Sequence, residues 1–248
     1  MTPLDALAIF ASGLAAGCIN VIVGSGSLIT FPVLLALGYP PVMANVSNTV
    51  GLVPGSASGA YGYRRELDGQ RTRLLWLGAA SVIGAVTGGL LLLVLPAETF
   101  EIVVPVLIAV ACVLVIAQPR LSAWLGGRTR HRHGGPWLWI GVLASGVYGG
   151  YFGAAQGVVL MALLAIFLDE GLQRVNAVKN VLAGVVNASA AVLFIFVAQV
   201  NWAIVVFIAA GSVLGGFAGA SIGRRLPPMV LRILIVVVGV TAIVKLLS

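Results

Sequence analysis

The chain has 248 residues, of which 60% are hydrophobic and only 8% are charged, and its mean hydropathy is +1.11. Soluble globular domains carry about 25% charged residues, so this composition excludes a water-soluble fold. Apolar runs of roughly 20 residues, the length that crosses a bilayer as a helix, recur along the sequence. The period-two alternation of β-barrel strands is absent. The composition therefore predicts an all-α polytopic membrane protein.

The formal net charge of +7 is concentrated in short loops, with arginines gathered at positions 64–73 and 120–132. Short loops rich in Lys and Arg are typical of the cytoplasmic side of a membrane. We therefore expect the lipid bilayer as a partner, and no nucleic acid. The same rule places both clusters inside and the N-terminus outside.

Ten apolar segments are expected along the chain, and the third is expected to be interrupted at Pro54-Gly55. The second segment is short, because ten helical residues reach only about 15 Å, half of the hydrocarbon core. Whether the second and seventh segments span the membrane or re-enter it is left open. The expected segments are 4–23, 28–37, 41–63, 74–95, 100–117, 137–152, 158–168, 172–198, 202–222 and 229–247.

Two breaks interrupt the apolar pattern at corresponding places, one at Gly24-Ser25-Gly26-Ser27 and one at Gly153-Ala154-Ala155-Gln156-Gly157. Closely spaced glycines loosen the backbone, and serine hydroxyls compete for its hydrogen bonds. Irregular backbone is tolerated at membrane depth only where protein or a water-filled cavity satisfies it. Paired interruptions in two halves are the best sequence pointer to the binding site of a transporter.

The two halves also match in detail, which predicts an internal duplication. Matching residues lie 131 to 133 positions apart. Because each half holds five segments, the two repeats are expected to be inverted relative to one another. The predicted units are a first repeat at 1–118, a basic cytoplasmic linker at 119–136 and a second repeat at 137–248. The matching pairs are Gly13 and Gly17 with Gly146 and Gly150, Asn48 with Asn180, Gly84 and Gly88 with Gly215 and Gly219, and Leu95-Pro96 with Leu226-Pro227.

Residues for catalysis are lacking. All seven acidic residues fall at segment ends or in loops, and both histidines, His131 and His133, lie in the basic linker. No paired carboxylates, metal-binding helix or Ser-His couple is apparent. We therefore expect no enzyme activity, no cofactor and no metal site. The Gly84-x-x-x-Gly88 and Gly215-x-x-x-Gly219 motifs are expected to be close-packing faces.

Neutral polar groups and one cation lie deep in the apolar segments, and they favour a small anion. Helices that start after the breaks, at Ser27 and Val158, direct N–H groups and positive dipole ends inward. Lys179 lies within a segment, where a charge is costly and points to function, although its long stem could instead reach the interface. The asparagines could equally be contacts between helices. The predicted substrate-binding residues are Asn20, Gly24, Ser25, Gly26, Ser27, Asn48, Tyr151, Gln156, Gly157, Lys179, Asn180 and Asn187.

Several motifs resemble the TauE/SafE sulfite-exporter-type permeases over the whole chain. The first half carries Gly-Ser-Gly-Ser-Leu-Ile-Thr-Phe-Pro at 24–32 and Ser-Asn-Thr at 47–49, and the second carries Tyr-Gly-Gly-Tyr-Phe-Gly-Ala at 148–154 and Asn-Ala-Val-Lys-Asn at 176–180. The sequence departs from the family pattern at Ser25, where the family usually has glycine, and at Gln156. These departures concern the substrate more than the fold.

The resemblance implies transport of sulfite, thiosulfate or a sulfonated organic anion across the bacterial inner membrane. We expect an exporter, and a homodimer is a possible assembly. Two alternatives remain open from the sequence. One is a proton-coupled importer of a sulfur-containing anion, and the other is a membrane scaffold or assembly protein that transports nothing.

Overall fold

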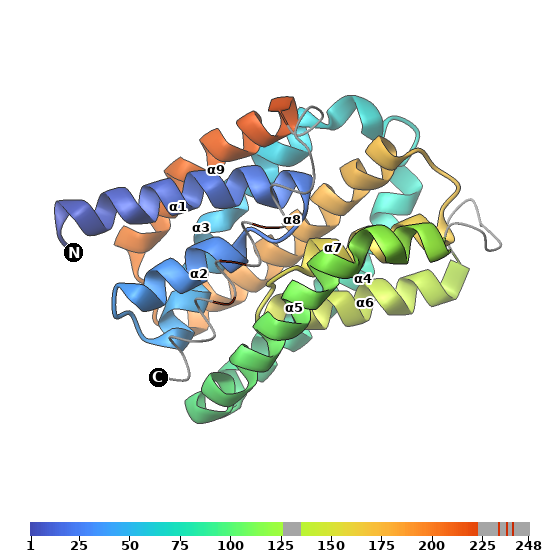
Figure 1. The fold of residues 1–248 in the computed structure, drawn as a ribbon. Helices are drawn as coiled ribbons and strands as arrows, with labels where there is room; N and C mark the ends of the chain where they lie inside the picture. Colours follow the sequence, from blue (N-terminus) through green and yellow to red (C-terminus); the bar gives the residue numbers. More distant parts are fainter. Residues whose placement is uncertain (126–134, 223–232, 234–236, 238–239, 241–248) are drawn as a thin grey trace.

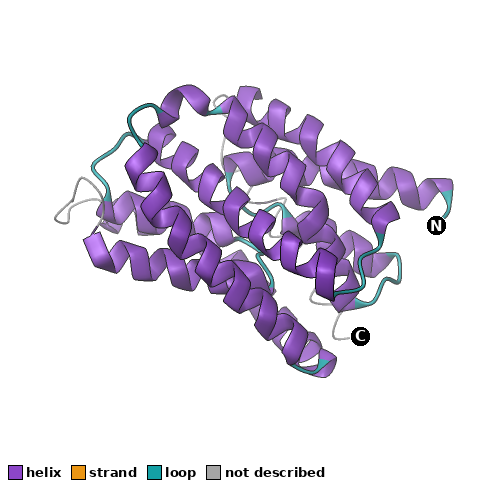
Figure 2. Cartoon of the chain, turned by 180° about the vertical axis from the view of Figure 1, so that it is seen from behind, coloured by secondary structure: helices purple, strands orange, loops and turns teal. Residues whose placement is uncertain are grey.

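The computed structural model describes residues 1–125 and 135–222, together with residues 233, 237 and 240. Within these residues the chain forms nine α-helices and one short 3₁₀ helix, without a β-strand (Figure 2). The helices are α1 (Pro3–Ile22), α2 (Ser27–Ala36), α3 (Pro41–Gly62), η1 (Arg64–Leu67), α4 (Arg71–Val94), α5 (Ala97–Leu125), α6 (Gly135–Tyr151), α7 (Gln156–Phe167), α8 (Leu172–Val197) and α9 (Trp202–Ile222).

Nine of the ten expected segments correspond to these helices, and the tenth, at 229–247, lies largely outside the described residues. Four helices, α1, α4, α8 and α9, are long and apolar enough to cross a membrane by their length and composition. Helix α5 continues to Leu125 and α6 begins at Gly135, so both helices extend into the expected linker at 119–136.

The predicted interruption at Pro54-Gly55 is wrong, because α3 runs through it as one helix. Proline removes one backbone donor, but neighbouring helices and hydroxyl groups can satisfy the freed carbonyls in an apolar bundle. Pro54 removes the donor to the Val50 carbonyl, and next to it the Ser212 hydroxyl of α9 donates to the Gly51 carbonyl at 3.2 Å.

The two short helices turn back instead of continuing through the bundle. A four-residue turn joins α1 to α2 and another joins α6 to α7, and each pair packs together as a hairpin. Figure 1 shows the first hairpin (α1–α2) starting from the end of the bundle that carries the N-terminus, and the second hairpin (α6–α7) starting from the opposite end. The turns of both hairpins therefore lie inside the bundle.

Each hairpin packs against a helix of the other half of the chain through glycines. The first hairpin packs on α9 and the second on α4. A Cβ atom on Gly84 or Gly88 of α4 would overlap backbone of α6, at the Val147 carbonyl in the case of Gly88. On α9, a Cβ on Gly215 would overlap the Leu14 carbonyl of α1. The predicted role of these glycine motifs as close-packing faces is confirmed.

The glycine contact between α4 and α6 can be tested on a single helix. A Gly88→Ala substitution forces α4 away from α6, and overpacking of this kind costs about 1–3 kcal/mol. Gly78→Ala is the matched control, since a Cβ on this α4 glycine meets nothing within 4 Å. We expect Gly88→Ala to lower the midpoint of thermal unfolding in detergent, followed by tryptophan fluorescence. Gly78→Ala should leave it unchanged or raise it, because alanine favours the helix by about 1 kcal/mol. Equal midpoints would contradict the packing role.

Candidate functional site

The turns of the two hairpins touch each other through their backbones, at a point we name the crossing (Gly24 and Gly157). The Gly157 N–H donates a hydrogen bond of 2.9 Å to the Gly24 carbonyl. A Cβ atom on either glycine would overlap the backbone of the other. Gly24 also has a φ of +88°, which L side chains rarely adopt. The crossing therefore requires glycine in both hairpins.

The predicted Gly26 lies beside the crossing and closes the first hairpin. It immediately precedes α2, and a Cβ on it would overlap the Ala16 carbonyl of α1. The second hairpin reaches its turn through Gly153 and Ala155, which have φ values of +76° and +58°. Its helix α7 begins at Gln156, two residues before the predicted start at Val158. Both short helices thus begin next to the crossing with their N-terminal, positive ends.

Side chains of the two long inner helices satisfy the carbonyl ends of α1 and α6. Lys179 of α8 is fully buried, and its Nζ donates to the carbonyls of Asn20 and Val21 at 3.1 and 3.0 Å. Asn176, one turn earlier, donates to the Val21 carbonyl at 3.3 Å. A cation at the C-terminal end of a helix is favourable. Lys179 therefore does not reach the interface, and it holds the end of α1.

The second hairpin is held in the same way from the first half of the chain. Asn45 of α3 donates from Nδ2 to the Tyr151 carbonyl at 3.0 Å, at the end of α6. Asn45 and Asn176 were not among the predicted site residues. A signal was present in the sequence, because each lies three residues before a predicted site residue, Asn48 or Lys179, on the same helix face.

Asn48 is fully buried and its side chain is occupied. It accepts a short hydrogen bond from the Thr30 hydroxyl, and its Nδ2 donates to the Ser27 hydroxyl at 3.2 Å. Both contacts join α3 to the start of α2. Asn48 and Ser27 therefore hold the first hairpin to α3.

Four other predicted site residues carry buried polar atoms without a hydrogen-bond partner among the described residues. Ser25 and Gln156 stand directly beside the two crossing glycines, and they are only 1% and 3% exposed. Burying a polar group without a partner costs about 1–3 kcal/mol. Such groups are expected where a ligand completes the hydrogen bonding. The atoms are Ser25 Oγ, Gln156 Nε2, Tyr151 Oη and Asn180 Nδ2.

Asn180 lines an open cavity of about 230 Å³ between α3 and α8. The other lining residues are mostly small and apolar, and they include Ser56 and Gly184. Asn187, two turns further along α8, donates to the Ser56 hydroxyl at 3.2 Å. Asn180 thus combines a free donor with adjacent space, whereas the Asn187 amide is engaged in a contact between α3 and α8.

The arrangement suits a small anion chemically. The Ser25 hydroxyl, the Gln156 amide and two positive helix ends lie beside the crossing. The Lys179 ammonium of α8 is bound to the Asn20 and Val21 carbonyls, three to four residues before Gly24. The acidic residues lie near the ends of helices or in turns: Asp5 at the start of α1, Glu66 and Asp68 in and just after η1, Glu98 and Glu101 among the first five residues of α5, and Asp169 and Glu170 between α7 and α8. The described residues contain no group of three or more His, Cys, Asp or Glu side chains that could hold a metal ion. His131 and His133 lie outside the described residues.

Known proteins resemble this chain over nearly its whole length. The sequence matches the family described as sulfite exporter TauE/SafE over residues 9–246. The probable membrane transporter protein YfcA of Escherichia coli K12 is 27% identical over 248 residues, which cover 100% of this chain and 91% of the relative. A probable membrane transporter protein of Haemophilus influenzae is 28% identical over 239 residues, covering 94% of this chain and 91% of the relative.

A third relative, the probable membrane transporter protein ORF9 of Sinorhizobium sp., is 25% identical over 242 residues, covering 97% of this chain and 91% of the relative. No solved structure matches the chain significantly. The family match includes both hairpins and the crossing between them. The chain therefore belongs to the TauE/SafE sulfite exporter family and is a membrane transporter.

Proposed function

We propose that the protein is a multi-pass permease of the bacterial inner membrane that exports a small sulfur-containing anion, sulfite, thiosulfate or an organosulfonate. The observation that carries the proposal is the pair of buried, unpartnered polar side chains, Ser25 and Gln156, at the crossing of the two hairpins. An anion with several oxygen atoms accepts hydrogen bonds from such donors and from the adjacent helix starts.

The similarity to known proteins supports a sulfur-containing anion as the substrate. The family is described as a sulfite exporter, and the relatives are named probable membrane transporters. Ser25 and Gln156 are also the positions where the sequence departs from the family pattern. We infer that they adapt the site to the particular anion that this protein carries.

We further propose that residues 1–118 and 137–248 are inverted repeats. The hairpins enter from opposite ends of the bundle (Figure 1). Each hairpin packs on a helix of the other half, because α1 packs on α9 and α6 packs on α4. Each carbonyl end of a broken helix is also held by an asparagine from the other half. Transporters of this kind place the substrate at the interface between the repeats.

A scaffold protein accounts less well for the site. Buried polar groups without partners destabilise a protein, and packing alone supplies no reason to retain them. A proton-coupled importer predicts a titrating group on the substrate path. Among the predicted site residues, the side chains that can titrate are those of Lys179 and Tyr151. Both alternatives are tested by the experiments below.

The substrate site can be tested with a matched pair of asparagines. Asn180 and Asn48 correspond in the two halves, but only Asn48 has its amide hydrogen-bonded. Asn180→Leu should preserve or raise the thermal unfolding midpoint, because it removes an unpartnered donor. It should also abolish the upward shift that sulfite, thiosulfate or a sulfonate induces. Asn48→Leu should lower the midpoint without ligand, by loss of contacts worth about 1–3 kcal/mol.

The ligand-induced shift is defined as the change in the unfolding midpoint of the wild-type protein when each of these anions is added. Sulfate and chloride are measured for comparison. A wild-type midpoint that no sulfur-containing anion raises would speak against the proposed substrate class. A full ligand-induced shift in Asn180→Leu would instead exclude Asn180 from the site.

The direction of transport follows from the membrane potential. Each elementary charge that crosses 100 mV is worth about 2.3 kcal/mol, and the cell interior is negative. An anion that leaves the cell therefore moves electrically downhill and needs no coupled proton. We expect an anion gradient to produce a current in proteoliposomes on a solid-supported membrane, with no dependence on an imposed pH gradient. Electroneutral turnover, or uptake driven by a pH gradient, would favour the importer.

Lys179 is proposed to supply positive charge to the site while it holds the end of α1. Lys179→Met should lower the unfolding midpoint, because the Asn20 and Val21 carbonyls lose a donor. It should also weaken anion binding measured by calorimetry. Asn176→Leu is the control, since it removes a neutral donor to the same Val21 carbonyl. This variant should lower stability and leave affinity intact. If folded Lys179→Met binds the anion as tightly as wild type, Lys179 serves the helix end alone.

A further inference from the structure

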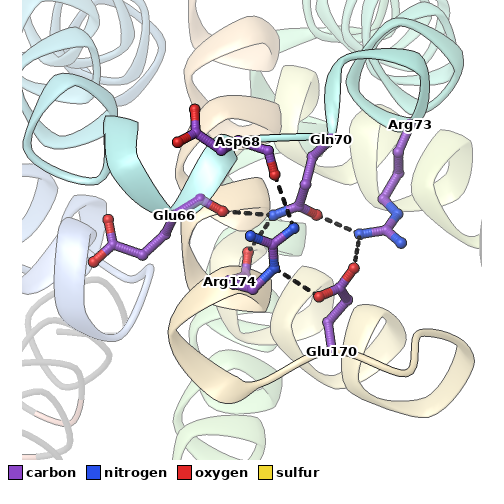
Figure 3. Close-up of polar contacts among 6 residues, drawn as sticks. All are labelled: Glu66, Asp68, Gln70, Arg73, Glu170 and Arg174. Atoms are coloured by element: carbon purple, nitrogen blue, oxygen red, sulfur yellow. Dashed lines mark hydrogen bonds and ion pairs between the residues drawn. The ribbon is translucent and has the colours of Figure 1, made fainter.

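A group of polar side chains fastens the start of α4 to the turn between α7 and α8 (Figure 3). We name it the Glu170 clip, and it comprises Gln70, Arg73, Glu170 and Arg174 with the backbone carbonyls of Glu66 and Asp68. In Figure 3, Arg73 and Arg174 approach the Glu170 carboxylate from two sides. The clip lies at the end of the bundle where the second hairpin enters, and it joins that hairpin to the first half of the chain.

The Glu170 carboxylate is shared by two guanidinium groups. Arg73 Nη1 lies 3.1 Å from Oε1, and Arg174 Nε lies 2.7 Å from Oε2. Arg73 comes from α4, so its ion pair connects the two halves, whereas Arg174 is four residues from Glu170 and orients it. Charge-assisted hydrogen bonds of this geometry are about twice as strong as neutral ones.

Backbone carbonyls complete the clip. Arg174 Nη2 donates to the Asp68 carbonyl at 2.9 Å. Gln70 Nε2 donates to the Glu66 carbonyl at 2.8 Å and to the Arg174 carbonyl at 3.4 Å, and Gln70 Oε1 accepts from Arg73. The segment from η1 to the start of α4 is thereby tied at several points to the start of α8.

The carboxylate is charged at neutral pH and only partly exposed. Partial burial opposes its ionisation, but hydrogen bonds from Arg174 and Arg73 outweigh this effect and lower the pKa of Glu170 below its ordinary value. Arg73 is only 5% exposed, so breaking the ion pair removes the Glu170 carboxylate from a buried guanidinium, which is costly. The clip therefore holds the two halves together with appreciable strength at this end.

The opposite end of the bundle is built differently. The turn from α2 to α3 and the turn from α8 to α9 meet there, and no Lys or Arg side chain of the described residues is present. A mainly apolar pocket of about 320 Å³, lined by residues that include Pro40, Leu93 and Gln199, lies at this junction. At this end the Asn201 N–H donates a hydrogen bond of 3.0 Å to the Ser47 hydroxyl, which joins the start of α9 to α3.

This asymmetry bears on how the crossing is reached from either side of the membrane. We propose that the Glu170 clip is a gate, closed in this structure, which must break before the crossing becomes accessible from the end that carries the arginines. The proposal rests on the proposed transport function. It concerns the motion of the second hairpin relative to α4 and not the identity of the anion.

The gate can be tested by the accessibility of a reporter cysteine at the crossing. Ser25→Cys is introduced into a Cys18→Ala/Cys112→Ala background, and its modification by a membrane-impermeant cationic methanethiosulfonate is timed in inside-out and right-side-out vesicles. A cation is chosen because an anion permease does not carry it. No transported anion is added, so the readout does not depend on the cargo.

Glu170→Gln should accelerate modification from the arginine-bearing end at least about tenfold. Loss of one charge-assisted hydrogen bond raises the population of the open state by about this factor. Arg73→Gln should act in the same direction, whereas Glu170→Asp, which keeps the charge, should give a smaller change. Glu98→Gln is the matched control, because it removes an exposed carboxylate from the first turn of α5. It should be modified at the wild-type rate.

The electrostatic effect of Glu170→Gln runs against the expected result, since removal of a negative charge repels the cationic reagent more strongly. Wild-type modification rates in both Glu170→Gln and Arg73→Gln, with unfolding midpoints showing folded protein, would overturn the gate. If neither variant folds, modification of Glu170→Asp at the control rate would overturn it equally. The two proposals can fail separately. If the clip variants are modified faster but no sulfur-containing anion raises the wild-type unfolding midpoint, the gate is retained and the proposed substrate is refuted.

Discussion

Backbone hydrogen bonding inside an apolar bundle is the constraint on which this structure depends. Each hairpin turn interrupts a helix, and the interruption leaves carbonyls at the end of one helix and N–H groups at the start of the next. Water cannot satisfy these groups within an apolar interior, so the protein must do so. The Gly157 N–H meets the Gly24 carbonyl directly, and Lys179, Asn176 and Asn45 donate to the remaining helix ends.

Close approach of backbones makes this solution feasible. The crossing glycines cannot carry a Cβ atom, and glycines on α4 and α9 let the hairpins lie directly against their partner helices. In an environment as apolar as the side chains, helices associate through such packing and through hydrogen bonds. The same contacts bring the donors of one half to the helix ends of the other. Packing and polar satisfaction are therefore coupled.

The hydrogen-bond donors beside the two turns are of two kinds, partnered and unpartnered. Asn48 and Asn45 have hydrogen-bond partners in the first half or across the crossing, and they hold the hairpins. Ser25 and Gln156 stand beside the same turns without partners among the described residues. Burial of such groups costs stability, and the proposed binding of an anion would return it. The Glu170 clip adds strong polar contacts at one end, where the two halves must separate if the crossing is to open.

The sequence by itself determined the membrane class, the helix succession and the position of both breaks, because composition, length and local glycine content are properties of short stretches of chain. It also pointed to the TauE/SafE family through motifs at those breaks. Tertiary structure alone decided that α3 continues through Pro54, that Lys179 holds the end of α1, and that Gly24 meets Gly157. It also decided that Asn48 is occupied while its counterpart Asn180 retains an unpartnered donor. These outcomes depend on residues more than 100 positions apart or on neighbouring helices, and no local pattern specifies which partner a buried polar group will find.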